Sequence, residues 1–294
     1  MTINDLSVRG DREEGRPAVS FVLPAFNEEE NIVSAIAETV KAAERSCSVY
    51  EVIVVDDGSG DRTAELVRDE AERNPAVRLV SHEFNKGYGQ ALRTGFTAAR
   101  LDFVFFTDSD NQFDMEELPL LLHWTDRCDV VAGYRKVRND PPVRKLNAWC
   151  WNRLVRFLFC VPVRDVDCAF KVFRRSALSG LDIQSRGAMI NTEIMVKLAR
   201  SGSSVVEVGV THLPRTAGTP QGAKPRVVLR ALMEVMVMYP ELTRLSARAP
   251  RGVPSNPTAN GRAVDHEAGD GGRSEPDDDH RGASASRDGV AQVA

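Results

Sequence analysis

The chain has 294 residues, 42% of them hydrophobic, which is enough for one large domain or two small ones. Its formal net charge of −4 gives no sign of a nucleic-acid partner. The sequence contains no run of 18 apolar residues, the length needed to span a membrane. The five cysteines include no C-x-x-C pair and follow no signal peptide, so we expect reduced thiols in a cytosolic protein; the scattered histidines offer no H-x-x-x-H pair for zinc.

Composition divides the chain into three parts. Residues 1–16 are polar and charged, and we expect a disordered leader. Residues 246–294 contain no Leu, Ile, Phe, Trp or Tyr, and we expect a disordered tail. Residues 17–245 are then the single folded domain.

Apolar runs alternate with helical patterns through the first half of this domain. Strands are expected at 18–23, 52–55, 77–80, 103–107 and 129–133. The continuous β-branched run at 52–55 is typical of a strand that is covered on both faces, as in a parallel sheet. The alternation predicts an α/β fold with a doubly wound, mostly parallel sheet.

Carboxylates follow two of these strands, as Asp56-Asp57 and as Asp108-Ser109-Asp110. Acidic side chains at the carboxyl edge of such a sheet lie where ligands bind. Asp108 and Asp110 could hold Mg²⁺ or Mn²⁺ and leave positions for diphosphate oxygens, and Gln112 could add a neutral oxygen ligand. The alternative is that Asp108 and Asp110 form only a turn and the N-cap of a helix that starts near Asp114.

A glycine-bearing turn at 85–90 opens the helix before the fourth strand. Its amides, with Lys86 beside them, suit a phosphate group. The turn lacks the third glycine of a dinucleotide fingerprint, and no G-x-G-x-x-G follows the first strand, which argues against a nicotinamide dehydrogenase.

Two segments of the second half predict amphipathic C-terminal helices. Residues 144–161 are basic and aromatic, which is typical either of a helix in a bilayer interface or of a packed helix with snorkelling arginines. Residues 227–239 are apolar except for Arg230 and Glu234, and could pack on the core, on lipid or on a membrane-embedded partner. The side chains expected at the membrane surface are Trp149, Trp151, Arg153, Arg156, Phe157 and Phe159.

With these motifs assembled, the chain resembles glycosyltransferase family 2, and within it the branch of dolichol-phosphate-mannose synthases. The matching segments, in the order of the family, are Leu23-Pro24-Ala25-Phe26-Asn27-Glu28, Val55-Asp56-Asp57-Gly58-Ser59, Asn85-Lys86-Gly87-Tyr88-Gly89, Asp108-Ser109-Asp110-Asn111-Gln112, Gly133-Tyr134-Arg135 and Asp165 to Arg175. The resemblance covers residues 18–225 and implies a Rossmann-like GT-A fold that binds a nucleotide sugar and a divalent metal.

The resemblance also implies roles for individual residues. The residues that line the nucleoside pocket would be Pro24, Phe26, Glu28, Val55 and Asp57, with Ser109 beside them. Asp108, Asp110 and Gln112 would hold Mg²⁺ or Mn²⁺ against the diphosphate. Arg135 and Arg215 would contact the donor phosphates, and Arg144 the acceptor phosphate. Two positions depart from the family: Phe26 replaces a usual tyrosine, and Gln221 stands where the mannose synthases have a lysine, which Lys224 could replace.

The expected function is inverting transfer of a hexose, such as mannose, from a GDP- or UDP-sugar to a polyprenyl (dolichyl-type) phosphate at the cytoplasmic face of the membrane. The alternative is transfer to a saccharide or small-molecule hydroxyl, which needs a general base because a hydroxyl, unlike a phosphate, is not already anionic. Asp165, Asp167 and Glu193 are the candidates, although either aspartate could instead form a salt bridge with Arg174 or Arg175. The competing class is a binding protein that has kept the fold and lost catalysis. The expected metal ligands and the arginines expected at the phosphates are all present, which argues against it.

Overall fold

The computed structural model describes residues 15–137, 142–187, 189–215 and 225–244, with only the backbone for 142–144 and 225–232. The predicted leader and tail therefore lie almost wholly outside the described residues. Among the described residues, no helix is long and apolar enough to cross a bilayer.

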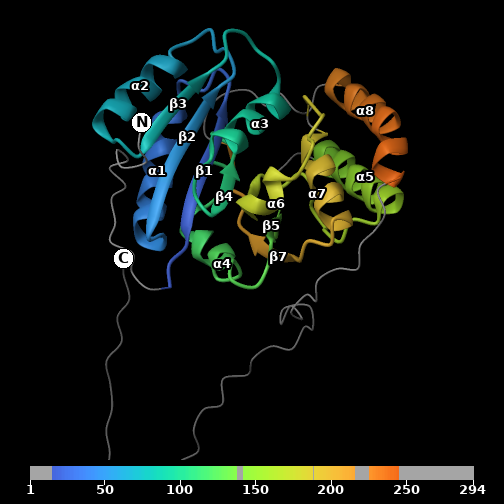
Figure 1. Ribbon diagram of the computed structural model, residues 1–294. Coiled ribbons are helices and arrows are strands. Elements are labelled where there is room, and N and C mark those ends of the chain that lie inside the picture. The colour runs from blue at the N-terminus through green and yellow to red at the C-terminus, as the bar shows by residue number, and fades with distance from the viewer. Residues whose placement is uncertain (1–14, 138–141, 188, 216–224, 245–294) are drawn as a thin grey trace, which may run out of the picture. The chain divides into compact units, whose positions relative to one another are not determined.

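A mixed sheet of seven strands forms the centre of the molecule (Figure 1), in the order β3-β2-β1-β4-β6-β5-β7. The strands are β1 (Ala18–Ala25), β2 (Val49–Asp56), β3 (Val77–Ser81), β4 (Phe103–Thr107), β5 (Val130–Arg135), β6 (Phe170–Arg174) and β7 (Val205–Val210). Strand β6 is antiparallel to both of its neighbours, and every other pair is parallel. The predicted α/β class and the mostly parallel sheet are therefore confirmed.

Helices follow most strands, as the sequence pattern predicts. They are α1 (Ile32–Ser46), α2 (Thr63–Arg73), α3 (Tyr88–Ala98), α4 (Leu118–Leu122), α5 (Pro142–Phe159), α6 (Arg175–Ser179), α7 (Ile190–Arg200) and α8 (Pro225–Arg244), with a 3-10 turn, η1 (Met115–Glu117), before α4. Asp114 caps η1 by accepting a hydrogen bond of 3.0 Å from the backbone N–H of Glu116. The expected helix cap therefore exists, but Asp114 makes it, and neither Asp108 nor Asp110 does.

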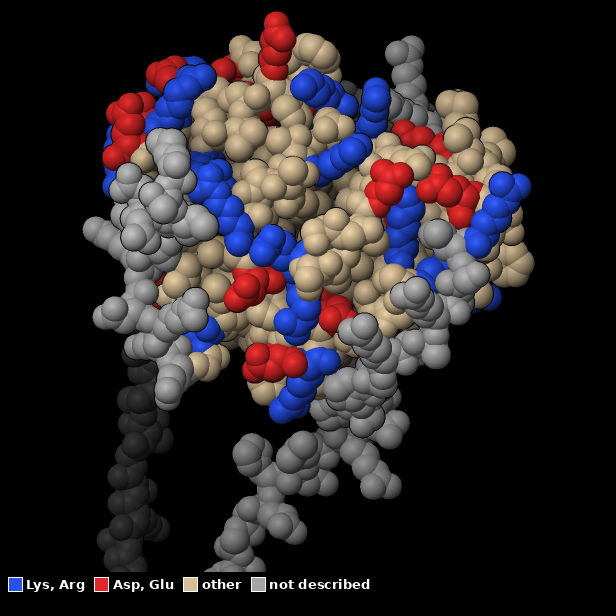
Figure 2. Space-filling view, viewed as in Figure 1, with Lys and Arg blue, Asp and Glu red and all other residues tan. Residues whose placement is uncertain are grey.

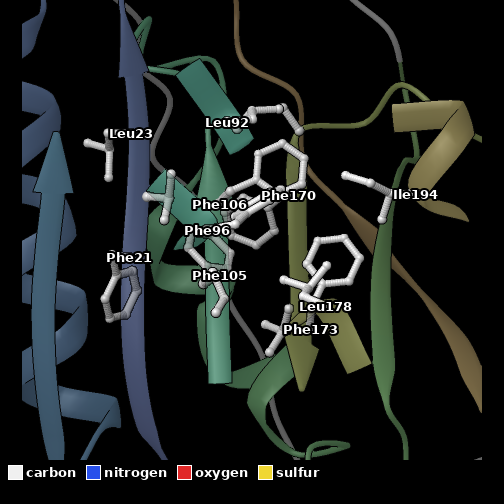
Figure 3. Close-up of a cluster of buried hydrophobic side chains, with 14 of the residues drawn as sticks. Phe21, Leu23, Leu92, Phe96, Phe105, Phe106, Phe170, Phe173, Leu178 and Ile194 are labelled. Atoms are coloured by element: carbon white, nitrogen blue, oxygen red, sulfur yellow. The ribbon is translucent and has the colours of Figure 1, made fainter. Parts of the chain in front are cut away.

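Aromatic side chains from β4 and β6 form much of the core (Figure 3). The rings of Phe105 and Phe170 meet edge to face at 4.8 Å, and those of Phe106 and Phe173 are stacked at 6.0 Å. Such pairs contribute roughly 0.5–1.5 kcal/mol each beyond the buried area. Helix α3 packs closely on the sheet because Gly95 has no side chain: a Cβ there would lie 2.3 Å from a methyl group of Val22.

The order of the strands fixes where ligands can bind. Along the chain, β2 and β3 are added in turn on one side of β1. The chain then crosses to the other side of β1, where it forms β4. The loops after β1 and β4 therefore diverge at the carboxyl edge of the sheet, and open α/β sheets bind ligands at such a topological switch point. The Asp108-Ser109-Asp110 segment follows β4 at this edge.

Candidate active site

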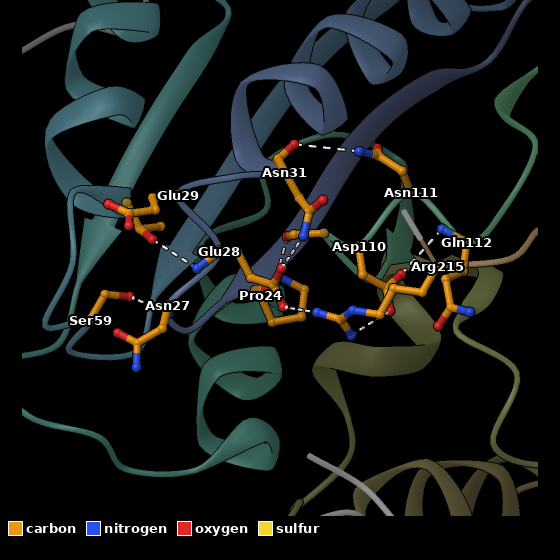
Figure 4. Close-up of polar contacts among 12 residues, drawn as sticks. Pro24, Asn27, Glu28, Glu29, Asn31, Ser59, Asp110, Asn111, Gln112 and Arg215 are labelled. Carbon is orange, nitrogen blue, oxygen red and sulfur yellow. Dashed lines mark hydrogen bonds and ion pairs between the residues drawn. The ribbon is translucent and has the colours of Figure 1, made fainter. Parts of the chain in front are cut away.

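The loops that follow β1 and β2 are joined by reciprocal hydrogen bonds (Figure 4). The backbone N–H of Asn27 donates to the hydroxyl of Ser59 at 2.9 Å, and the N–H of Gly60 donates to Oδ1 of Asn27 at 2.8 Å. The N–H of Glu29 donates to Oδ2 of Asp61 at 3.2 Å. Asn27 has a φ of 55°, in the left-handed region that asparagine tolerates better than most residues. These contacts fix the wall of the predicted nucleoside pocket.

Ser109 ties the end of β4 to the end of β1. Because the carbonyl of Ala25 accepts from the N–H of Asp57 on the β2 side, the carbonyl of Pro24 faces the opposite side, where the hydroxyl of Ser109 donates to it at 2.8 Å. Ser109 is buried. The hydroxyl of Ser109 is therefore enclosed and already bonded, and the place of Ser109 beside the donor stays a prediction.

Asp108 lies at the end of β4 beside Tyr88, which begins α3. The hydroxyl of Tyr88 donates to Oδ1 of Asp108 at 3.0 Å. Burial raises the pKa of Asp108 to about 7, and the negative charge of Asp110 adds to the rise. The sequence analysis did not single out Tyr88, although it lies inside the glycine-bearing turn.

Arg215 bridges two acidic side chains of the site. One guanidinium nitrogen lies 3.2 Å from Oδ2 of Asp110, and another donates to Oε1 of Glu28 at 2.8 Å (Figure 4). Burial raises the pKa of Asp110, and Arg215 opposes that rise. Three residues that the sequence analysis assigned to the donor site are thus brought together from β1, β4 and the segment after β7.

A short backbone bridge explains how Arg215 reaches Asp110 from far along the chain. The N–H of Leu213 donates to the carbonyl of Gln112 at 2.8 Å, and the side-chain Nε2 of Gln112 donates to the carbonyl of Leu213 at 3.3 Å. The backbone N–H of Gln112 also donates to Asp110 at 3.2 Å. Because Nε2 is used in this way, Oε1 of Gln112 is the atom that could bind a cation.

The residues present fit a divalent cation. The negative charge of Asp110 makes ionisation of Asp108 more costly. The guanidinium of Arg215, 3.2 Å from Asp110, offsets part of the charge of Asp110. Carboxylate and amide oxygens are ligands for Mg²⁺ and Mn²⁺. Within the described part of the chain, no group of three or more Asp, Glu, His or Cys side chains is arranged to hold a metal. A cation here would therefore need further ligands, which diphosphate oxygens could supply.

The predicted nucleoside pocket combines exposed and buried side chains. Phe26 is 38% exposed, so its ring offers an open face for stacking on a base. Val55 is fully buried in β2, so it supports the pocket from beneath and does not line it. Asp57 is also buried, directly after β2.

The carboxylate of Asp57 organises the glycine-bearing turn. The N–H groups of Lys86 and Gly87 donate to its two oxygens at 2.9 and 2.8 Å, and the N–H of Gly89 donates to the carbonyl of Arg186 at 2.9 Å. The expectation that these amides bind a phosphate is therefore wrong, because a carboxylate of the protein already fills the place of the anion. Gly87 is required here, since its φ is 99° and a Cβ would lie 2.7 Å from the Arg186 carbonyl.

Arg135 does not lie free for the donor phosphates. Its guanidinium forms a bidentate pair with Asp165, with N–O distances of 2.6 and 2.7 Å, and both side chains are only 8% exposed. This corrects the predicted role of Arg135. It also corrects the partner expected for Asp165, because Arg174 pairs with Asp129 and Arg175 donates to the carbonyl of Leu101.

Glu193, a candidate base, is also committed to structure. It is fully buried, and its oxygens accept from the backbone N–H groups of Gln184 and Ser185 at 2.8 and 2.7 Å and from Nζ of Lys197 at 2.7 Å. Such a carboxylate cannot collect a proton from a substrate without losing these contacts. Asp167, the third candidate, is half-buried.

Lys171 is a functional candidate that the sequence analysis missed. It lies in β6 opposite Phe106 and is 1% exposed, and its Nζ donates to the carbonyls of Cys168 and Val166, the latter at 3.1 Å. Burial lowers its pKa. It therefore fixes the turn that carries Asp165, close behind the Asp108 carboxylate. A lysine inside an otherwise apolar strand was the available signal.

Helices α5 and α8 present apolar side chains to solvent. In α5, Trp149 and Phe157 are 63% and 82% exposed, whereas Trp151 is half-buried and Phe159 is buried. The predicted set of membrane anchors is therefore too large, because Trp151 and Phe159 face the protein. The ring of Phe159 lies 5.8 Å from that of Tyr239 in α8. In the part of α8 whose side chains are described, residues 233–244, the exposed apolar side chains are Met233, Met236, Val237 and Tyr239.

Some predicted residues cannot be placed. The side chains of Arg144 and Arg230 lie outside the described residues, as do Gln221 and Lys224 altogether.

Comparisons with known proteins identify the family of the chain. A family model described as glycosyl transferase family 2 matches residues 20–181. The chain is 33% identical over 204 residues to an undecaprenyl-phosphate 4-deoxy-4-formamido-L-arabinose transferase of Pectobacterium atrosepticum, covering 68% of this chain and 61% of that protein. It is 32% identical over 224 residues to glycosyltransferase AglD of Haloferax volcanii, covering 70% of this chain and 36% of that protein.

Solved structures share the fold. Glucosyl-3-phosphoglycerate synthase from Mycobacterium tuberculosis, in complex with phosphoglyceric acid, matches with a TM-score of 0.61 at 20% identity, covering 75% of this chain and 79% of the other. The same synthase with Mn²⁺, uridine diphosphate and phosphoglyceric acid matches with a TM-score of 0.60. The chain spans about 61% of the length of the curated arabinose transferases that it matches.

Proposed function

Since the chain belongs to glycosyl transferase family 2, we propose that it transfers a hexose from a nucleoside-diphosphate sugar to a polyprenyl phosphate. The observation that carries this proposal is the group of Asp108, Asp110 and Arg215 at the switch point of the sheet. The similarity to undecaprenyl-phosphate transferases supports a lipid phosphate as the acceptor. The donor is a UDP- or GDP-hexose, and mannose is one candidate sugar.

Asp108, Asp110 and Oε1 of Gln112 are the atoms that would hold Mg²⁺ or Mn²⁺. Solved structures of the same fold contain Mn²⁺ or Mg²⁺ together with uridine diphosphate, which supports this choice. The cation would supply a Lewis acid for the leaving diphosphate.

The remaining side chains bind and orient the donor. Phe26 stacks on the base, and Asp57 accepts a hydrogen bond from it. Pro24 and Glu28 complete the pocket, in which Glu28 also orients Arg215 through their 2.8 Å pair. Arg215 stabilises the negative charge that develops on the diphosphate as the sugar leaves.

The acceptor phosphate attacks without a general base, because it is already anionic at neutral pH. A single in-line displacement inverts the anomeric centre. Arg144 is our candidate for the acceptor phosphate. For a hydroxyl acceptor a base would be needed, whereas Asp165 and Glu193 are committed to buried contacts.

A lipid-linked acceptor requires the protein to work at a membrane surface. We place α5 and α8 there, at the cytoplasmic face, because Trp149 and Phe157 are exposed beside the exposed bases Arg153 and Arg156. Figure 2 shows basic and acidic side chains together near the upper rim of the molecule, where Figure 1 has the carboxyl ends of β1 and β2.

A panel of labelled UDP- and GDP-hexoses, incubated with polyprenyl phosphate and Mn²⁺, tests the proposal. Labelled sugar is expected in the organic extract, with the inverted anomer by NMR, and neither Asp110→Asn nor EDTA-treated protein should produce it. Asp126→Ala, at an exposed position of the same charge, is the matched control. Label that reaches only a saccharide or small-molecule hydroxyl would replace this proposal with the alternative acceptor.

A further inference from the structure

Three polar side chains form a chain of hydrogen bonds behind the predicted nucleoside pocket. Thr94 lies in α3, His82 follows β3, and Asp57 follows β2. Nε2 of His82 lies 2.9 Å from the hydroxyl of Thr94, and Nδ1 of His82 lies 2.6 Å from Oδ1 of Asp57. The side chains of His82 and Asp57 are only 6% and 4% exposed.

The chemistry of these groups fixes the direction of the contact. An ionised carboxylate only accepts hydrogen bonds, so the proton lies on Nδ1 of His82, which donates to Asp57. The other ring nitrogen is then held by Thr94, whose hydroxyl donates to it in the neutral imidazole. The imidazole is thus clamped on both sides and cannot rotate without losing a bond.

The two oxygens of Asp57 are not equally used by the described residues. Oδ1 accepts from both Nδ1 of His82 and the backbone N–H of Lys86, whereas Oδ2 accepts from the N–H of Gly87. A carboxylate has about four acceptor positions in all, so the fourth is on Oδ2. His82 therefore fills one oxygen of the carboxylate and leaves one acceptor position on the other.

We propose that His82 and Thr94 are positioning residues that set which base the donor carries. They hold Asp57 so that Oδ2 meets a ring N–H. Uracil and guanine present such an N–H beside a carbonyl group, whereas cytosine and adenine present an unprotonated ring nitrogen there. A fixed acceptor attracts the ring N–H of uracil or guanine and repels the unprotonated ring nitrogen of cytosine or adenine. Because a buried acceptor left without a partner is costly, the discrimination is large. The inference rests on the proposed function, in which Asp57 faces the base.

A purely structural role gives a different expectation. Asp57 also anchors the turn at 85–87, so loss of His82 could simply loosen α3. Loosening the turn would weaken every ligand of the site alike. Misplacing the acceptor would weaken only ligands that carry the selected base, and the part of the site that holds the diphosphate would be unaffected.

The experiment measures binding of UDP, GDP, CDP and pyrophosphate to the full chain in the presence of Mn²⁺, by calorimetry. The variants are His82→Phe, which removes both ring contacts, and Thr94→Val, which removes only the outer one. Thr94→Ser keeps the hydroxyl that Thr94→Val removes. Thr97→Val is the matched control, because Thr97 is exposed in the same helix and its hydroxyl donates to the carbonyl of Arg93, away from His82.

We expect His82→Phe to weaken the preferred nucleotide, UDP or GDP, by about ten-fold, the effect of losing roughly one hydrogen bond to a charged group. Thr94→Val should weaken it about three-fold, and Thr94→Ser and Thr97→Val should not change it. The affinities for CDP and pyrophosphate should stay within two-fold, so that the preference for the selected base shrinks. If His82→Phe fails to fold, the comparison of Thr94→Val with Thr94→Ser decides the same question.

Equal losses for nucleotide and pyrophosphate would assign His82 a structural role only, and unchanged affinities in both variants would also overturn the inference. Either result leaves the proposed function intact, because the wild-type protein would still bind its donor nucleotide. Absence of nucleotide binding by the wild-type protein would instead overturn the proposed function, and this inference with it.

Discussion

The buried pair of Arg135 and Asp165 gives the sharpest prediction about stability. Two hydrogen bonds of 2.6 and 2.7 Å join the pair, and each side chain is 8% exposed. Burial alone would lower the pKa of Arg135, yet its hydrogen bonds to Asp165 keep that pKa above its ordinary value. The pair is therefore ionised, and Asp165→Ala would leave a buried guanidinium without its counter-charge.

Removing one partner of a buried pair costs about 3–5 kcal/mol of unfolding free energy. For a domain of this size each kcal/mol lowers the melting temperature by roughly 2–4 °C, so Asp165→Ala should melt roughly 10 °C below the wild-type protein. Urea unfolding followed by circular dichroism measures the free energy directly. Asp126→Ala, at an exposed position, should change it by less than about 0.5 kcal/mol.

The double variant Arg135→Met with Asp165→Leu separates charge from packing. It removes both charges and fills the space with apolar atoms, so it should be more stable than Asp165→Ala. If Asp165→Ala unfolds at the same urea concentration as Asp126→Ala, the pair is not structural. Arg135 would then return as a candidate for the donor phosphates.

Three further predictions concern the cation and the membrane. Asp108→Asn or Asp110→Asn should abolish Mn²⁺ binding measured by electron paramagnetic resonance, without lowering the melting temperature; undiminished binding by both variants would reject the metal site. The pKa of Asp108 is raised to about 7 in the metal-free protein, so protons compete with the cation and Mn²⁺ affinity should fall as pH drops below about 7. The metal-free protein itself should lose stability as pH rises through that value. An affinity that stays constant between about pH 5.5 and 8 would contradict this reasoning. Replacing Trp149 and Phe157 together by Ala should reduce sedimentation with anionic vesicles several-fold at low salt, whereas Leu120→Ala, an exposed leucine of α4, should not; equal sedimentation of all three proteins would refute the interfacial role of α5.

Periodicity in the sequence predicted the parts of the fold whose environment is uniform. The strands at 18–23, 52–55, 77–80 and 103–107 are mostly apolar runs that pack within the sheet, and each is confirmed with the same or slightly wider bounds. Strand β6 was missed because Lys171 interrupts its apolar pattern. The carbonyl groups that satisfy this lysine belong to Val166 and Cys168, only a few positions earlier, but the turn that directs them at Lys171 forms only in the folded chain.

The site was predicted as a set of residues but not as a set of contacts. The sequence placed Asp108 and Asp110 at a strand end, and the family resemblance named Arg215; the structure adds the contact of Arg215 with Asp110, 105 positions away. Residue types alone could not show that Arg135 is paired or that the amides near Lys86 are taken. Both outcomes depend on carboxylates, Asp165 and Asp57, that are brought in by distant segments.

The interlocked loops after β1 and β2 have a consequence for the thermodynamics of donor binding. Because Asn27, Ser59 and Gly60 already hold one another, the entropy of ordering these loops is lost during folding and not during binding. A nucleoside entering such a preformed wall should bind with little rearrangement of the backbone. Loosening the wall, as in Ser59→Ala, should therefore leave the chemical step unchanged and make donor binding entropically more costly.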